Sequence, residues 1–369
     1  MPAQHSGRLV APDYLKSFLL ALVIFGHTYS DGVTDDAVKY AVYGVHMPAF
    51  LFLSGYLLPV ERLAGESIGA VFQKYWRRML WQWAVVTVLY TAWVTGPRGS
   101  SPAESLVLDI TNPRFHLWYV PVLLWAIVLL WAVAPFRRAR LAAGAVALAA
   151  TVIYTSPLAG MWGIVPAFDE RYLTCVLYVW LGVALRQGWL PAPRGLVLPS
   201  VAVVAGAAVY LYGFLAGSWW TAGGRLVLTV GLCLALPAVL RLMERPVRGL
   251  VPVTNIIGTY SLWIYLLHPF ITNGWVGAGS RAHEVLGGAA LTVGVLAASV
   301  VLGWGWQSLT SRSAARAALS GGPMPVAAGA PAVTSPAGPA AVPPAATVAA
   351  PTAPAAATSP APASTLAPR

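Results

Sequence analysis

Ten apolar stretches, each close to the length that crosses a bilayer, constrain this chain more than any other feature. A membrane-spanning helix needs about 20 mainly apolar residues. The 369 residues are 58% hydrophobic and only 9% charged, which exceeds what a soluble domain needs for its core. We therefore predict an all-α polytopic protein of the cell membrane with about ten transmembrane helices. The predicted helices are residues 12–30, 39–60, 78–96, 116–135, 139–156, 172–189, 196–215, 225–242, 255–274 and 285–307.

Lysine and arginine are distributed unevenly over the connections between these helices. If the N-terminus is cytoplasmic, 17 of the 23 basic residues fall on the cytoplasmic side and 6 outside. Such a bias marks cytoplasmic connections, so we predict that both termini are cytoplasmic. The same bias accounts for the net charge of +11, because the basic residues punctuate apolar stretches instead of clustering on an exposed domain. We expect the lipid bilayer as a partner and no nucleic acid.

The last part of the chain differs in composition from the rest. It is rich in Ala, Pro, Thr and Ser and carries almost no charge. Such a segment cannot bury enough apolar area to offset the entropy of ordering it. We predict a membrane domain over residues 1–312 and a disordered cytoplasmic tail over residues 313–369. The longest predicted outer connection, residues 95–115, is rich in Gly, Ser and Pro and is expected to be a loop.

Five of the six histidines fall in the predicted outer half of the membrane domain, namely His27, His46, His116, His268 and His283. A single histidine at this depth is commonly an amphipathic anchor. Ionisable groups within membrane helices, however, usually face one another or water. We therefore predict a shared polar cavity.

Lys16 and His27 lie eleven residues apart in the first stretch. At roughly 100° per residue they share one helix face, about 16 Å apart along the axis. An imidazole titrates near neutral pH, so His27 is the best candidate for a general base. Asp31, four residues later, either orients its ring or is solvated surface. Lys16 either contacts the phosphates or thioester oxygen of a donor, or reaches the inner headgroups as an anchor.

Several other side chains are candidates for binding substrate or donor. Ser54 follows His46 at helical spacing, with Pro48 expected in the first turn of that helix and Gly55 expected to allow close helix approach. Ser261, Tyr265 and His268 form a polar stripe on the ninth stretch. The remaining candidates have a second interpretation as interface aromatics or topology signals: Trp118, Tyr119, Arg77 and Arg78.

Several segments resemble one known family. A basic residue, ten residues and a histidine in the first membrane helix, followed by HMPAFLFLSGYL (46–57), FHLWYVPVLL (115–124) and SLWIYLLHPFI (261–271), are similar to the acyltransferase 3 family of membrane acyltransferases, most of all its sugar O-acetyltransferase branch. The resemblance implies an acyltransferase with His27 as general base. Lys16 replaces the arginine of many members, which removes a bidentate guanidinium contact.

The combined prediction is a membrane O-acyltransferase. It would move an acyl group, expected to be acetyl, from acyl-coenzyme A to a hydroxyl of a sugar or other acceptor. Acyl-coenzyme A is then a co-substrate, and no tightly bound cofactor is expected. The candidate catalytic residues are His27, Lys16, His46 and His268, and the candidate coenzyme A contacts are Lys16, Arg77 and Arg78. The candidate substrate contacts are Ser54, Trp118, Tyr119, Ser261 and Tyr265.

Two other function classes fit the composition. A transporter or exporter could use the polar stripe as a permeation path, but it has no need for the Lys16 and His27 spacing. A membrane scaffold would explain the tail and leave the histidines unexplained. Cys175 and Cys233 lie in apolar stretches, so neither a disulfide nor a metal site is predicted. Motifs of zinc hydrolases, serine hydrolases and nucleotide-binding loops are absent from the sequence.

Overall fold

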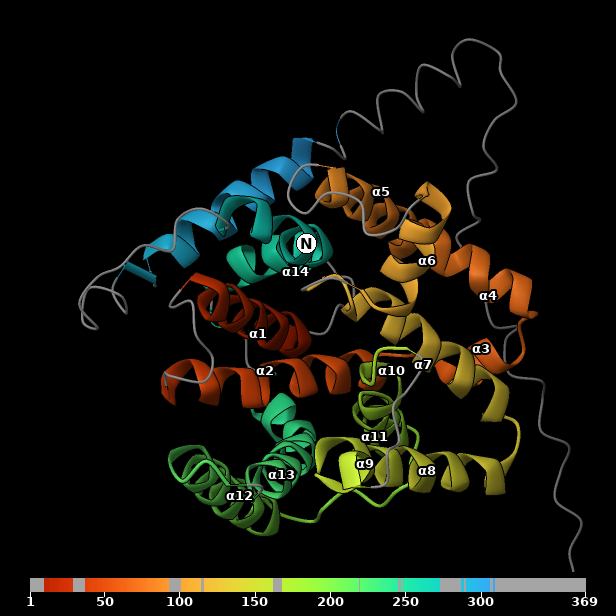
Figure 1. The fold of residues 1–369 in the computed structure, drawn as a ribbon, viewed down its shortest axis with the longest axis vertical. Coiled ribbons are helices and arrows are strands. Elements are labelled where there is room, and N and C mark those ends of the chain that lie inside the picture. The colour runs from red at the N-terminus through yellow and green to blue at the C-terminus, as the bar shows by residue number, and fades with distance from the viewer. Residues whose placement is uncertain are drawn as a thin grey trace, which may run out of the picture. The chain divides into compact units, whose positions relative to one another are not determined.

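The structure is a computed structural model that describes residues 10–28, 37–92, 101–113, 116–161, 168–218, 220–244, 247, 249–272, 287–288, 290–305 and 308. These residues all belong to one unit of the chain, residues 1–313. Every regular element in the described ranges is helical (Figure 1). The predicted tail (313–369), Asp31 and His283 lie outside the described residues.

The helices follow the apolar stretches of the sequence. They are α1 (Val10–Thr28), α2 (Ala37–Tyr56), α3 (Val60–Ala64), α4 (Ile68–Tyr75), the π-helix η1 (Trp76–Leu80), α5 (Trp81–Tyr90), α6 (Pro102–Thr111), α7 (Tyr119–Val133), α8 (Arg137–Thr155), α9 (Leu158–Met161), α10 (Arg171–Thr174), α11 (Val176–Arg186), α12 (Val197–Leu215), α13 (Trp220–Leu242) and α14 (Val251–Thr272). A further apolar helix covers Ala290–Gly305. Each of the ten predicted stretches therefore overlaps a helix.

Three of the described helices are long and apolar enough to cross a membrane by length and composition. They are α1, α12 and α13, with mean hydropathies of 1.3, 1.8 and 1.9. Helix α7 and the helix Ala290–Gly305 are apolar but shorter. The fold is thus all-helical with apolar helices, whereas the number of crossings and their direction stay predictions from the sequence.

Helix α2 occupies the centre of the described fold, where it packs against α1, α11 and α13 (Figure 1). Its crossing with α11 is very close, since a Cβ atom on Gly55 would lie 2.1 Å from the main-chain oxygen of Val179. A Cβ atom on Gly182 of α11 would likewise lie 2.1 Å from the main-chain oxygen of Phe52. Small residues allow membrane helices to approach in this way. The close approach predicted at Gly55 is confirmed.

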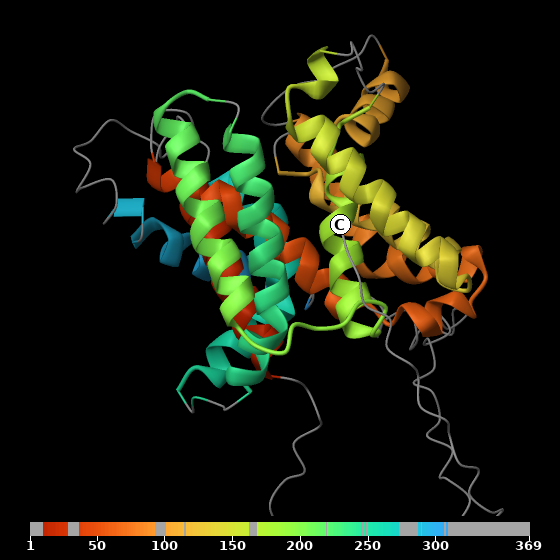
Figure 2. The same cartoon turned by 90° about the horizontal axis from the view of Figure 1, so that it is seen from below.

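Helices α12 and α13 lie side by side and pack tightly (Figure 2). Glycines again occupy the contact, because Cβ atoms on Gly206 and Gly224 would clash with the backbones of Leu228 and Tyr210. This pair also packs against α2 through α13. Side chains of α12 and α13 are therefore brought to the N-terminal half of α2, close to its histidine.

Two local expectations were wrong. Pro48 lies inside α2, because the helix begins at Ala37, eleven residues earlier. The connection 95–115 contains the helix α6, which begins at Pro102. Its N-cap Ser101 accepts a hydrogen bond from the backbone N–H of Glu104 at 3.1 Å. This Ser-Pro-x-Glu pattern is a readable helix start, and the Gly and Ser content of the segment obscured it.

Candidate functional site

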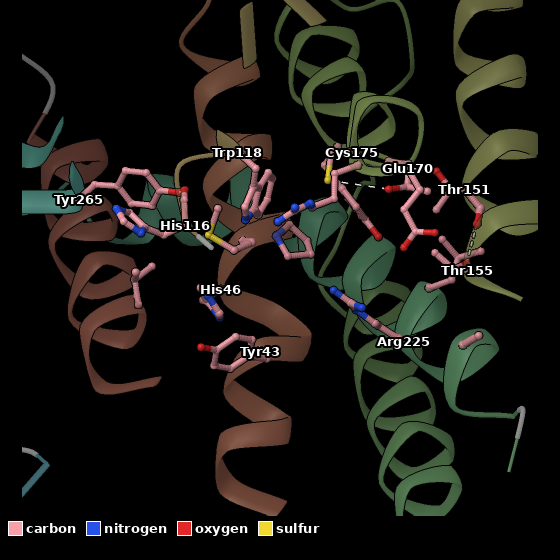
Figure 3. A pocket seen from close by; sticks show the side chains of 18 of the residues that line it. Tyr43, His46, His116, Trp118, Thr151, Thr155, Glu170, Cys175, Arg225 and Tyr265 are labelled. Carbon is pink, nitrogen blue, oxygen red and sulfur yellow. Dashed lines mark hydrogen bonds between the residues drawn. The ribbon is translucent and has the colours of Figure 1, made fainter. Parts of the chain in front are cut away.

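A cavity of about 420 Å³, here called the histidine chamber, lies between α1, α2, α8, α13 and α14. His27, His46 and His116 line it, together with Trp118 and Tyr265. Figure 3 shows Tyr265 and His116 at one end of this chamber and Thr151 and Thr155 at the other. Its volume is in the range of small-molecule sites.

Three histidines line this chamber, and the fourth, His268, is fully buried beside them. The ring of His268 lies 5.1 Å from that of His27 and 5.2 Å from that of His116, measured between ring centroids. His46 joins the group through Tyr43, whose ring lies 5.1 Å from His46 and 5.9 Å from His27. Four segments far apart in the sequence thus contribute to one polar cluster.

Main-chain carbonyls hold three of these rings. His46 donates from Nδ1 to Val42 at 2.6 Å, and His116 donates from Nε2 to Leu266 at 3.3 Å. His268 donates from Nδ1 to the carbonyl of Tyr265 at 2.8 Å. A carbonyl only accepts, so each of these nitrogens carries its hydrogen. In the neutral ring the other nitrogen then holds a lone pair.

The bond of His268 follows from the sequence of α14. Pro269 inside this helix has no N–H, so it cannot bond the carbonyl of Tyr265 as an ordinary residue would. His268 supplies the missing donor instead. Its Nε2 and the Nδ1 of His116 are buried and have no hydrogen-bond partner among the described residues. Buried polar atoms without partners are uncommon and mark places where a polar ligand can bind.

His27 differs from the other three histidines. Its Nδ1 lies 3.4 Å from the hydroxyl of Tyr43, and no main-chain carbonyl of the described part holds its ring. The side chain lines the histidine chamber and is only half-buried. If Nδ1 donates to Tyr43, Nε2 holds the lone pair and can accept a proton from a bound hydroxyl.

A second cavity of about 400 Å³, here called the lysine chamber, is lined by Lys16, Ser54, Arg78 and Ser261. Arg78 comes from the π-helix η1, a type of local irregularity frequent at functional sites. Neighbouring Arg77 is exposed and does not line this chamber. Of the two predicted coenzyme A contacts on η1, only Arg78 is therefore placed at a cavity.

Tyr265 lines both chambers and stands between them. Its hydroxyl donates to the main-chain carbonyl of His116, which fixes the ring. Beside it, Tyr119 lines the lysine chamber, with its ring centroid 5.2 Å from that of Tyr265. Ser54 donates to the carbonyl of Phe50 at 2.9 Å and accepts from the Tyr119 hydroxyl at 2.6 Å. Three of the five predicted substrate contacts, Ser54, Tyr119 and Tyr265, thus lie at the boundary between the two chambers, whereas Ser261 lines the lysine chamber.

Trp118 lies in the histidine chamber and contacts a residue that the sequence did not single out. The guanidinium of Arg171 lies 4.9 Å from the centroid of the Trp118 ring and is paired with Asp169. This cation–π contact holds the indole at the wall of the chamber. Glu170 and Arg225 also line the chamber. The sequence assigns Glu170, Arg171 and Arg225 only to the predicted outer side of the membrane, and no spacing links them to His27.

A family model described as an acyltransferase domain, that of the acyltransferase 3 family, matches residues 9–304. Searches of curated proteins and of solved structures gave no match. Among the described residues, no three His, Cys, Asp or Glu side chains are grouped so that they could hold a metal ion.

Proposed function

Since this chain belongs to the acyltransferase 3 family and is a membrane acyltransferase, we propose that it transfers an acetyl group from acetyl-coenzyme A to a hydroxyl of a sugar-like acceptor. The observation that supports this most is the pair of chambers separated by Tyr265. One chamber is basic, as an anionic donor requires. The other contains the histidine cluster, as proton removal from a hydroxyl requires.

The lysine chamber suits the donor. Lys16 and Arg78 both line it, and coenzyme A carries phosphates that form charge-assisted hydrogen bonds with such groups. The predicted topology places this end of α1 on the cytoplasmic side, where acyl-coenzyme A is found. The thioester end of the donor would then reach the boundary formed by Tyr265, Tyr119 and Ser54.

The histidine chamber suits the acceptor. The oxygen of an acceptor hydroxyl attacks the thioester carbon while His27 removes its proton at Nε2. The carbon–sulfur bond breaks, and coenzyme A leaves as the thiol after taking up a proton, so that an ester and free coenzyme A result. Tyr43 would accept the Nδ1 hydrogen of His27 and orient its ring. His116 would contact the acceptor through its unpaired Nδ1, whereas the fully buried His268 would position the rings of His27 and His116, which it contacts.

A transporter is the rival function. It would need a continuous polar path, but Tyr265 stands between the two chambers and its hydroxyl is bonded to the backbone of His116. Membership of an acyltransferase family also favours the enzyme. Movement of an acceptor across the membrane without acetylation is the result that would indicate a transporter.

Substitution of His27 tests this function. His27→Ala and His27→Asn should lower transfer of labelled acetyl to a panel of hydroxylated acceptors by about 10² to 10⁴, the usual cost of losing a positioned base. The proteins are purified and compared at equal amounts after measurement of their membrane abundance. His5→Ala, at a histidine outside the predicted helices, is the matched control. Full transfer by His27→Ala would contradict the role of His27.

A further inference from the structure

We propose that a third cavity, beside the histidine chamber, binds a second hydroxylated ring of the acceptor, so that the preferred acceptor is a neutral glycoside of at least two linked rings. This inference rests on the proposed function and extends it to acceptor specificity. The cavity measures about 510 Å³ and lies between α2, α8, α12 and α13. We call it the tyrosine chamber, since Tyr40, Tyr43, Tyr154 and Tyr210 line it.

The tyrosine chamber adjoins the histidine chamber. Tyr43, Thr155, Glu170 and Arg225 line both. Because Tyr43 also contacts His27, a molecule with a hydroxyl at His27 can extend past this tyrosine into the tyrosine chamber. A single sugar ring would leave this second volume unfilled.

The charges at the junction indicate a neutral polyhydroxylated ligand. Glu170 and Arg225 face both chambers, and in the described part of the chain neither side chain forms an ion pair. Figure 3 shows Arg225 extending from α13 at the histidine chamber. Glu170 lies at the end of this chamber that is away from Tyr265 (Figure 3). Hydroxyl groups both donate and accept, so neighbouring hydroxyls of one ring can serve a carboxylate and a guanidinium together. A purely anionic or cationic acceptor would be repelled by one of them.

The aromatic wall is rigid. The rings of Tyr40 and Tyr210 stack with centroids 4.2 Å apart and planes at 15°, and the Tyr210 hydroxyl donates to the main-chain carbonyl of Tyr40 at 3.0 Å. Tyr40 also packs against Phe214, with ring centroids 4.3 Å apart, so the wall is a fixed apolar surface against which a sugar ring can pack. Tyr154 lines the chamber, and its hydroxyl has no hydrogen-bond partner among the described residues. Aromatic walls with a few polar groups are typical of small-molecule sites.

The test compares one-ring and two-ring acceptors. The probes are methyl glycosides of glucose, galactose and mannose, each supplied as the single sugar and as the corresponding disaccharide. Acetyl transfer from labelled acetyl-coenzyme A gives kcat/KM for every probe. We expect at least one disaccharide to exceed its single sugar by about tenfold or more, the effect of one added charge-assisted hydrogen bond.

The variants Glu170→Gln and Arg225→Gln should remove this preference, with a loss for the disaccharide at least fivefold larger than for the single sugar. Arg241→Gln, near the other end of α13 and outside the chambers, is the matched control. Equal use of one-ring and two-ring probes by the wild type, or equal losses for both in the variants, would overturn the inference.

A second measurement separates this inference from the proposed function. The shift of the thermal unfolding midpoint by the same glycosides reports binding without any acyl transfer. Midpoint shifts by disaccharides that vanish in Glu170→Gln, together with no acetyl transfer by the wild type, would retain the subsite and overturn the proposed function. Acetyl transfer with equal use of single sugars and disaccharides, and with no shift of the unfolding midpoint, would retain the proposed function and overturn the subsite.

Discussion

In each of the four histidines at the chamber, a different neighbour determines which ring nitrogen carries the hydrogen. His46, His116 and His268 each have one nitrogen committed to a main-chain carbonyl. His27 has only the Tyr43 hydroxyl, at 3.4 Å from its Nδ1. A base must change its protonation state during the reaction, and a ring held by a hydroxyl that can rotate accommodates that change best. These contacts are the reason for proposing His27, and not one of the other three histidines, as the base.

Tyr43 should act by positioning this base. Tyr43→Phe removes the hydroxyl and keeps the ring that packs against His46 and Gly26. We expect kcat to fall about two- to tenfold, as for one neutral hydrogen bond, and KM for the donor to stay within about twofold. The measurement is steady-state transfer of labelled acetyl at several acetyl-coenzyme A concentrations and saturating acceptor. An unchanged kcat would remove Tyr43 from the mechanism.

Lys16 should act on the donor. Lys16→Ala is expected to raise KM for acetyl-coenzyme A by about tenfold or more, because a charge-assisted hydrogen bond to phosphate is lost. Lys16→Arg should restore part of the affinity, since the charge remains although its geometry differs. Lys74→Ala is the control, as Lys74 pairs with Glu66 on the surface and does not line the lysine chamber. If both alanine variants bind the donor alike, Lys16 is an anchor.

The sequence predicts some of these residues better than others. The histidines could be grouped because each falls at a similar depth in an apolar stretch. Lys16 and His27 share a helix, so their spacing is readable. Glu170 precedes α10 and Arg225 belongs to α13, and the two line one chamber because α13 packs against α8 and α11, which also contact α10. No pattern within a single segment carries that information.

At the scale of helices, the crossing of α2 and α11 decides the position of the boundary residues. Gly55 and Gly182 each face a main-chain carbonyl of the partner helix, so the backbones touch. Ser54, next to Gly55, is held at this depth and meets Tyr119. Any widening of the crossing would move Ser54 away from Tyr119 and open the boundary between the chambers.

Gly182→Ala should therefore destabilise the fold. Its Cβ would lie 2.1 Å from the main-chain oxygen of Phe52, and overpacking typically costs about 1 to 3 kcal/mol. We expect a lower thermal unfolding midpoint and reduced transfer. Gly223→Ala in α13, where a Cβ meets nothing within 4 Å, should leave the midpoint unchanged or slightly raised. Equal midpoints for the two variants would show that the crossing is looser than described.

The sequence predicts where helices occur but not how each apolar stretch is divided into helical segments. Apolar stretches of about 20 residues indicate helices wherever they occur, and every predicted stretch overlaps one. The division of the third stretch and its upstream residues into α4, η1 and α5 was not visible, because hydropathy does not distinguish a π-helix from an α-helix. Hydropathy also gave no sign of α6, because this helix is short and its segment is rich in Gly and Ser. Ser101 and Glu104 nevertheless signal its start.

At the scale of the whole molecule, the described helices enclose three chambers with different linings. Composition predicted the helical membrane class, and the family model supports a membrane acyltransferase. The chambers themselves depend on contacts between segments more than 200 residues apart, such as α1 with α14. Sequence spacing cannot supply such contacts, and the separation of the chambers by Tyr265 emerged only from the fold.

Acetyl transfer between the two chambers can be tested with donor and acceptor on opposite sides of a membrane. Proteoliposomes of one orientation carry labelled acetyl-coenzyme A on the side of residues 137–140 and methyl glycosides on the other side. We predict labelled glycoside under this arrangement, no label with the two sides exchanged, and strong loss in His27→Asn at equal protein abundance. Transfer only when both substrates share one side, or movement of the glycoside across the membrane without acetylation, would contradict this prediction.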